Sequence, residues 1–406
     1  MRCCIDKIAV KATVFMIFLA VVVTGTLSAE IFEYKYATGN KYRIVSVVDE
    51  DVYIDRVFSH RSRILNRVTY EVTDAEGPIA RINATYASSE QVQEGDTSFQ
   101  WDEEYSSTFG MDRLGYYTIG SEYYVPQVRN APVFPDRDLK VGESWTAEGY
   151  EIHDFRKAFD IAEPYRIPFE AHYVFLGYRE WKGQSYPVFS VSYRIFFEPT
   201  PVTGRIFPRR ILGATDQLIY WDLEIGQAVA YDENFRIIIE LSNGMTVEHR
   251  GRAEAEVIES EIMKKEDIAK SIADEIARLG IEDASVRIDE EGITINLENI
   301  QFLPNSAILQ EGEKSKLDKI GEILKAFSER DILVSGHTAL AGTPAARLQT
   351  SQERAAAVAN YLISKGVRNS SQVVIRGYGA ERPLAPNNTA EGMAKNRRVE
   401  ITLLEN

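Results

Sequence analysis

Residues 30–252 contain short runs that are rich in β-branched and aromatic side chains and are separated by turn residues. The runs lie at 42–48, 68–72, 171–178, 188–197, 217–222 and 236–241, with turns such as Lys182-Gly183 and Asn243-Gly244 between them. Strands at this hairpin spacing are typical of an all-β fold. The sequence therefore predicts that residues 30–252 are mostly β, built as a sandwich or an open barrel.

The composition supports a packed core and narrows the chemistry. Of the 406 residues, 44% are hydrophobic and 26% are charged, which excludes wholesale disorder, and the length corresponds to two or three domains. A net charge of −15 argues against a nucleic-acid partner. Because Cys3 and Cys4 are the only cysteines, the rest of the chain cannot form a disulfide, a zinc–thiolate site or a thiol nucleophile.

The N-terminus has the organisation of a secretory signal peptide. Basic residues precede an apolar run at 12–24, and small residues follow at 25–29. The run is short for a membrane span, which needs about 20 residues, so we expect cleavage after Ala29 rather than a retained anchor. Both cysteines precede the run, so a lipid anchor is not expected. The mature chain is therefore predicted to be exported and to have no transmembrane span.

A transmembrane β-barrel is the alternative for an exported β-rich region. It would need about eight or more strands of about 10 residues, each with an apolar row that faces lipid. Several runs are shorter, and charges such as Arg179, Glu180 and Glu240 interrupt or end them. Residues 126–168, which are rich in proline and charge, also fit a barrel wall poorly. We therefore expect residues 30–252 to form a soluble domain.

Residues 253–292 form a strongly acidic segment, with 13 acidic and 5 basic residues. Ile268, Ile272 and Ile276 recur at helical spacing, and Gly280 stands where a helix C-cap belongs. The residues that follow have the pattern of a hairpin. The segment is predicted to be a small helix-hairpin connector.

Strands and helices alternate in residues 293–406. Strands are expected at 293–299, 332–335, 373–375 and 398–404, and helices at 311–328 and about 347–364. The order βαβαββ predicts an α/β domain in which helices cover one face of a mixed sheet.

Five landmarks in this stretch carry a family resemblance. They are residues 300–306, Gly336-His337-Thr338, the run 351–355 that contains Ser351, Arg354 and Ala355, Gly377-Tyr378-Gly379, and the run 396–400 that begins Asn396-Arg397-Arg398. In order and spacing, residues 293–406 resemble the OmpA-like domain, which attaches cell-envelope proteins to peptidoglycan. The resemblance implies recognition of the cell wall rather than catalysis.

The resemblance also implies a binding site for the peptide stem of peptidoglycan, whose diamino acid carries an ammonium and a carboxylate. In the family pattern, an aspartate directly after Gly-His-Thr takes the ammonium, and the arginine of Ser-x-x-Arg-Ala takes the carboxylate. Arg354 stands at the second position, but Ala339 stands at the first. The expected ligand-binding residues are Thr338, Ala339, Arg354, Asn396 and Arg398, with Arg347 as an added cationic contact. For Arg397 and Arg398, bracing of the last strand against the loop above it is the alternative to ligand contact, and it is the preferred role.

The missing aspartate leaves two hypotheses. A methyl group cannot pair an ammonium, and the lost interaction of about 1.5–3 kcal/mol predicts weak or altered affinity. The first hypothesis is a non-enzymatic envelope protein that still associates with peptidoglycan. The second is a periplasmic scaffold whose OmpA-like domain no longer binds peptidoglycan. In both, the location is the periplasm or cell envelope, outer-membrane association included, and residues 30–252 are expected to contact other envelope proteins.

Catalytic motifs are not found in the sequence. The five histidines are scattered, and the chain contains no His-Glu-x-x-His, Gly-x-Ser-x-Gly or P-loop pattern. We therefore expect no enzymatic activity, no cofactor and no metal.

Overall fold

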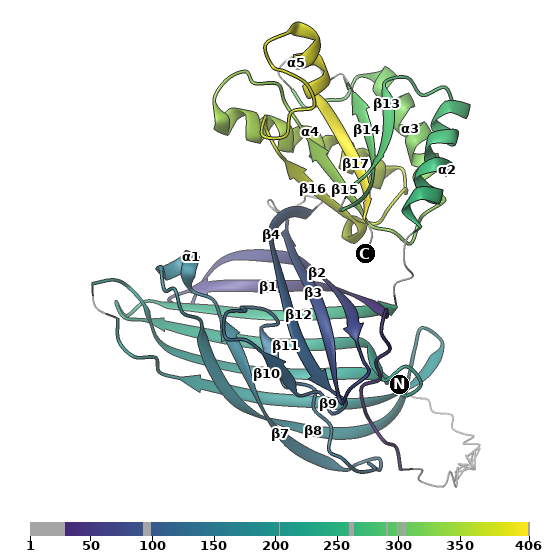
Figure 1. Cartoon of the computed structure of the whole chain (residues 1–406). Coiled ribbons are helices and arrows are strands. Elements are labelled where there is room, and N and C mark those ends of the chain that lie inside the picture. The colour runs from purple at the N-terminus through teal and green to yellow at the C-terminus, as the bar shows by residue number, and fades with distance from the viewer. Residues whose placement is uncertain are drawn as a thin grey trace, which may run out of the picture.

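The computed structural model describes residues 29–404 apart from 92–98, 203, 260–263, 290, 299, 301 and 303–305. The predicted signal peptide, up to residue 28, lies outside the described residues. The remainder forms a large β-rich part and a smaller α/β part, which lie next to each other as Figure 1 shows.

The β-rich part is one continuous, strongly curved antiparallel sheet. Its described strands are β1 (Lys41–Ile54), β2 (Val57–Asp74), β3 (Ile79–Glu90), β4 (Phe99–Asp112), β5 (Tyr117–Ile119), β6 (Val128–Arg129), β7 (Ser144–His153), β8 (Tyr165–Trp181), β9 (Gln184–Phe197), β10 (Pro208–Asp222), β11 (Gln227–Leu241) and β12 (Thr246–Glu259). A short helix, α1 (Arg156–Phe159), lies between β7 and β8. The prediction of a mostly β region is confirmed.

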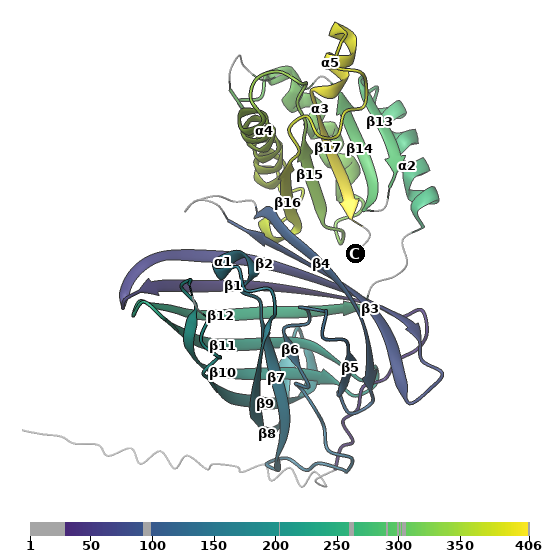
Figure 2. The same ribbon diagram turned by 60° about the vertical axis from the view of Figure 1, so that its left-hand side comes forward.

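The strands pair in the order β5-β4-β3-β2-β1-β12-β11-β10-β9-β8-β7-β6. This ladder is unbroken, and its curvature is visible in Figure 2. Of the two folds that the sequence predicts, the structure therefore has the open, curled sheet rather than two stacked sheets.

Aromatic side chains fill one end of the concave face. Phe134 packs edge-on against Phe189 and Trp221, with ring centroids 5.2 and 4.7 Å apart, and Phe32 stacks on Phe134. All four side chains are buried. Because such rings bury large apolar areas, this cluster anchors β8 to β10 around the chain segments that cross the concave face.

The α/β part contains a mixed sheet with helices on one face, as predicted. Its elements are α2 (Lys265–Arg278), β13 (Ala284–Ile288), β14 (Gly292–Glu298), α3 (Glu311–Lys325), β15 (Ile332–Gly336), α4 (Pro344–Ser364), a 3-10 turn (Ser370–Gln372), β16 (Val373–Gly377), α5 (Ala390–Asn396) and β17 (Arg398–Leu404). The strand order is β13-β14-β17-β15-β16, and only β15 and β16 run parallel.

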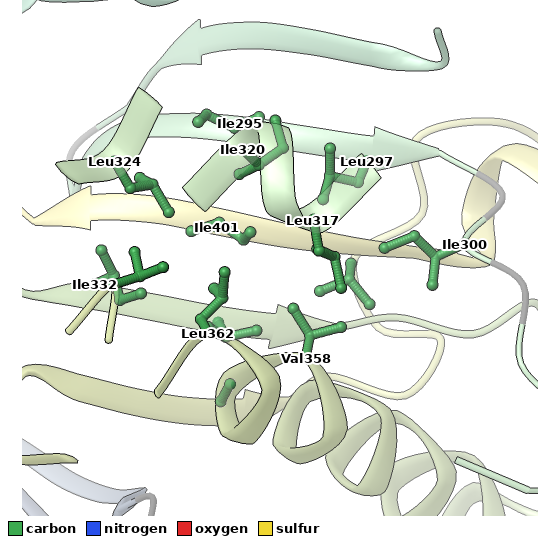
Figure 3. Packing of buried hydrophobic residues seen from close by; sticks show 14 of the residues in the cluster. Ile295, Leu297, Ile300, Leu317, Ile320, Leu324, Ile332, Val358, Leu362 and Ile401 are labelled. Carbon is green, nitrogen blue, oxygen red and sulfur yellow. The ribbon is translucent and has the colours of Figure 1, made fainter. Parts of the chain in front are cut away.

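Alternate residues of these strands point toward the helices. Ile295, Ile332 and Ile401 lie beneath α3 and α4, which contribute Leu317 and Val358 to the same core (Figure 3). The period of two in the strands and the apolar stripes of the helices produce this layer directly.

The acidic segment 253–292 does not form a separate unit. Residues 253–259 continue β12, while Ile272 and Ile276 of α2 are buried in the core shared with α3 and α4. The predicted helix and hairpin are present, with β13 paired to β14. The apolar stripe of α2 explains the difference from the expected connector, because a single helix can bury that stripe only against a larger neighbour.

The two parts meet where the start of β4, beyond its pairing with β5, lies beside the edge strand β16. Val374 and Ile375 pair in parallel with Phe99 and Gln100, which extends one sheet into the other (Figure 2). Trp101 packs on Leu333, Val374 and Leu404, the apolar residues on the sheet face opposite the helices. The junction therefore combines strand pairing with a small apolar contact.

A buried ion cluster lies at the same junction. Asp331 is 2% exposed and accepts a hydrogen bond of 2.7 Å from Arg67 of β2. Arg43 of β1 lies 3.4 Å from the same carboxylate oxygen. Both arginines belong to the β-rich part, so one carboxylate of the α/β part interacts with two cations across the junction.

Within the part of the chain that the structure describes, none of the helices combines the length and the apolar character needed to cross a bilayer.

Candidate functional site

The first half of α4 packs directly on the ends of β15 and β16. Thr343 caps the helix, because its hydroxyl accepts a hydrogen bond of 3.2 Å from the amide of Ala346. A Cβ at Gly336 would lie 1.9 Å from the carbonyl oxygen of Ser351, and one at Gly377 would lie 2.7 Å from the Ser351 hydroxyl. The glycines of the Gly-His-Thr and Gly-Tyr-Gly landmarks therefore allow the close approach that brings α4 to the strand ends.

The loop that follows β15 is held by backbone hydrogen bonds. The amide of Thr338 donates to the carbonyl of Gly379 at 2.7 Å, and the amide of Leu340 donates to the side-chain oxygen of Asn387 at 3.0 Å. Thr338 and Ala339 are buried, and the Thr338 hydroxyl has no hydrogen-bond partner in the described structure. At the position of the family aspartate, the loop offers only the methyl group of Ala339.

Arg354 of α4 is half-buried and carries an unpaired charge. Its guanidinium carbon lies 5.0 Å from the ring centroid of Phe302, and its Nε is buried without a hydrogen-bond partner. Burial lowers the pKa of Arg354, and the nearby cation of Arg397 lowers it further. Among the described residues, no carboxylate forms an ion pair with Arg354 within 4.0 Å. The site therefore contains a cation without a counter-charge.

Arg347 lies two helical turns before Arg354 on the same face of α4. Its Nη1 donates to the carbonyl of Gly342 at 2.5 Å, while its Nε is buried and has no partner in the described part of the chain. The backbone of Arg347 also borders the turn at Gly379. The structure thus places Arg347 beside the turn that holds Thr338, whereas Arg354 lies beside Phe302 and Arg397.

Asn396 is fully buried at the end of α5 and is hydrogen-bonded to the loop before that helix. Its side-chain oxygen accepts from the amides of Leu384 and Ala385, at 2.8 and 3.0 Å. Its amide group donates to the carbonyl of Ala385 and to the side chain of Asn387. Since Asn387 also holds Leu340, Asn396 links the loop that contains Ala339 to α5.

Arg398 is 4% exposed and belongs to a buried network around Glu400. Its Nε donates to Glu400 at 2.7 Å and its Nη2 donates to the carbonyl of Arg382 at 3.0 Å. Arg287 of β13 holds the same carboxylate with two hydrogen bonds of 2.8 Å. These contacts correspond to the bracing role that the sequence left as the alternative for Arg398.

The charges of this network reinforce one another. Burial raises the pKa of Glu400, but hydrogen bonds from Arg287 and His337 outweigh it and hold the pKa well below its usual range. Burial lowers the pKa of His337, whose Nε2 lies 3.4 Å from Glu400 and whose ring stacks on Tyr378. Sequence reasoning missed Arg287, because it lies in β13, before the residues that carry the resemblance.

Comparison with known proteins identifies relatives of the α/β part. Residues 301–397 match the OmpA family. The probable lipoprotein YiaD of Escherichia coli K12 is 38% identical over 120 residues, which cover 29% of this chain and 54% of that protein. The peptidoglycan-binding protein ArfA of Mycobacterium tuberculosis H37Rv is 35% identical over 104 residues, or 26% of this chain and 32% of that protein.

A third relative is matched over most of its length. The peptidoglycan-associated lipoprotein of Pseudomonas putida is 33% identical over 125 residues, which cover 31% of this chain and 73% of that protein. The chain spans about half of YiaD and a third of ArfA, so it shares one region with these two relatives rather than their whole length.

Proposed function

The chain belongs to the OmpA family, and from this we propose that it is a non-enzymatic, exported cell-envelope protein that associates with peptidoglycan through residues 293–406. We also propose that its binding site is altered, so that affinity for the usual stem peptide is weak. The proposed location is the periplasm or cell envelope. The similarity to the peptidoglycan-binding protein ArfA and to the peptidoglycan-associated lipoprotein of Pseudomonas putida supports the association with peptidoglycan.

The observation that carries the proposal is the unpaired guanidinium of Arg354. A carboxylate of the stem peptide would supply the counter-charge that the described residues lack, through a charge-assisted hydrogen bond. The buried hydroxyl of Thr338 is available as a further polar contact. Arg398 has a supporting role in the site, because its guanidinium is hydrogen-bonded to Glu400.

The alteration rests on Ala339. An ammonium placed beside its methyl group would lose water without gaining a carboxylate, at a cost of about 1.5–3 kcal/mol. Glu400 does not replace the missing aspartate, because Arg287 and Arg398 already occupy its oxygens. Ala339 also supports the second candidate function, a periplasmic scaffold that no longer binds peptidoglycan.

Co-sedimentation of the purified protein with insoluble peptidoglycan tests the proposal. Wild-type protein is expected to sediment weakly, and Arg354→Ala is expected to sediment less. Ala339→Asp restores the acidic partner and is expected to lower the apparent Kd about ten- to a hundredfold.

Two matched variants control for charge alone. Ala341→Asp places the same charge on an exposed residue of the same loop, and Arg278→Ala removes an exposed arginine of α2. Both are expected to sediment as wild type does. If Arg354→Ala leaves strong wild-type binding unchanged, the site assignment is wrong. If neither wild type nor Ala339→Asp sediments, the wall association is refuted and the scaffold function remains.

A further inference from the structure

The concave face of the β-rich part encloses a cavity of about 490 Å³. Its walls come from β1 to β4 on one side and β10 to β12 on the other, and the chain segments 34–36 and 125–132 close it. The volume lies in the range of small-molecule sites in proteins, about 300–1,000 Å³. The aromatic cluster around Trp221 fills the neighbouring part of the concave face, so the cavity is a distinct space inside the sheet.

Tyrosine rings form much of the wall. Tyr34 and Tyr36 stack with centroids 6.0 Å apart, and Tyr70 meets Tyr86 edge-on at 6.3 Å. Burial raises the pKa of all four hydroxyls, so they remain uncharged. The wall therefore presents neutral aromatic rings, whose faces carry negative partial charge.

The charged side chains of the lining are mostly acidic. They are Asp102, Glu103 and Glu233 against the single cation Arg67. Arg67 is bound to Asp331 at 2.7 Å and to the carbonyl of Ser371 at 2.8 Å, so its charge is already neutralised. Glu103 pairs with Lys157. An anionic ligand would meet carboxylates and ring faces without a cation to receive it.

Glu233 of β11 is a partly buried carboxyl of this lining, whereas Asp102 is exposed. In the described part of the chain no cation pairs with it, and its neighbour across the ladder is the neutral Gln217 of β10. Burial raises the pKa of Glu233, a hydrogen bond from Gln217 opposes the shift, and the charge of Glu151 of β7 adds to it, so that the pKa is about 7. The other titratable groups around it are Tyr193, Tyr231 and the His153 ring that holds Glu151.

We propose that this cavity binds a small organic cation, an amine or quaternary ammonium, whose charge pairs with Glu233 and whose apolar body lies against the tyrosine rings. Cations bind over aromatic faces, and more strongly where water is excluded. A ligand of this class supplies the counter-ion that Glu233 lacks, which a neutral ligand does not. The Tyr86 hydroxyl, which lines the cavity, is a polar contact for the bound molecule.

The test compares two ligands of nearly equal shape. Choline is titrated by calorimetry into the purified protein at pH 8, and 3,3-dimethylbutan-1-ol, its uncharged carbon analogue, is titrated in parallel. Choline is expected to bind at least about tenfold more tightly, because only choline gains the ion pair and the ring contacts. Equal binding of the alcohol, or no binding of choline, overturns the proposal.

Glu233→Gln separates the charge from the shape of the site. The variant is expected to lose the preference for choline by about tenfold or more while keeping its fold, as circular dichroism would show. Choline binding to wild type is expected to strengthen as pH rises through about 7, because Glu233 must lose its proton to pair. Glu224→Gln, at an exposed turn residue, is expected to match wild type. If Glu233→Gln retains the preference, the cation does not bind at Glu233.

Discussion

Each of the two parts of the molecule contains a poorly solvated charge that has no ion-pair partner among the residues the structure describes, and the two charges have opposite signs. Arg354 of the α/β part lies in the middle of α4, beside Phe302 and Arg397. Glu233 of the β-rich part lies inside the curved sheet beside Gln217. Because an unpaired charge away from water destabilises a fold, each marks a place where a ligand of opposite charge would stabilise the protein.

The junction between the two parts shows the contrasting arrangement. There Asp331 is bound to Arg67 and lies close to Arg43, and all three side chains are buried. This carboxylate has its counter-charges within the chain and serves to hold the parts together. The comparison therefore teaches that paired and unpaired buried charges have different roles here, the first in stability and the second in recognition.

Removing the charge of Asp331 tests the paired case and has the largest expected effect. Asp331→Asn removes the carboxylate that pairs with the buried guanidinium of Arg67, which costs about 3–5 kcal/mol. Urea unfolding followed by tryptophan fluorescence measures the loss. Asp318→Asn breaks a half-exposed pair with Lys365 and is the control, with an expected cost of about 0–1 kcal/mol. Equal losses in the two variants would contradict the structural role of Asp331.

The unpaired carboxyl of Glu233 makes the opposite prediction for stability. Its pKa of about 7 in the folded chain exceeds the unfolded value of about 4.3, so the folded state binds the extra proton between these values. Stability is therefore lost as pH rises through this window, by about 4 kcal/mol in total. Glu233→Gln is expected to match wild type at pH 4 and to exceed it by up to that amount at pH 8.

Urea midpoints of wild type and Glu233→Gln at the two pH values measure this difference. The comparison isolates Glu233, because the two proteins differ only at that residue. Glu224→Gln, whose carboxyl is exposed, is expected to follow wild type at both pH values. A wild type that is as stable as Glu233→Gln at pH 8 would show that Glu233 is solvated or paired in solution.

The sequence predicted the fold where local patterns are strong. The predicted β-rich runs all lie inside strands, and the sheet and two long helices of the α/β part are as expected. β12 was missed, because its inward positions include Gly251, Ala253 and Ala255 and its outward positions carry charges such as Arg250 and Arg252. A strand whose inward residues are small contains no run of β-branched side chains. For this reason the strand that extends into the acidic segment at residue 253 was not predicted.

The sites were predictable only where a family pattern exists. The landmarks located Arg354 and Ala339, whose surroundings the structure now describes. The cavity depends on pairing of β1 with β12, strands about two hundred residues apart, which brings Tyr70 of β2 and Glu233 of β11 into one space. Local periodicity places each of these residues on a strand face but does not say which strands close the sheet.

Substitution of Arg354 is expected to have the smallest effect on stability. It also allows a direct comparison of an unpaired arginine with a paired one. Arg354→Met removes a half-buried guanidinium that has no carboxylate partner in the described chain, so the relief of desolvation offsets the lost contact with Phe302. The net change in unfolding free energy is expected to be at most about 1 kcal/mol. Arg398→Met, the same substitution at a guanidinium paired with Glu400, is expected to cost about 3–5 kcal/mol. Urea unfolding of the two variants measures both values. A large loss of unfolding free energy in Arg354→Met would show that Arg354 stabilises the fold. The explanation that Arg354 is present to bind a ligand would then be contradicted.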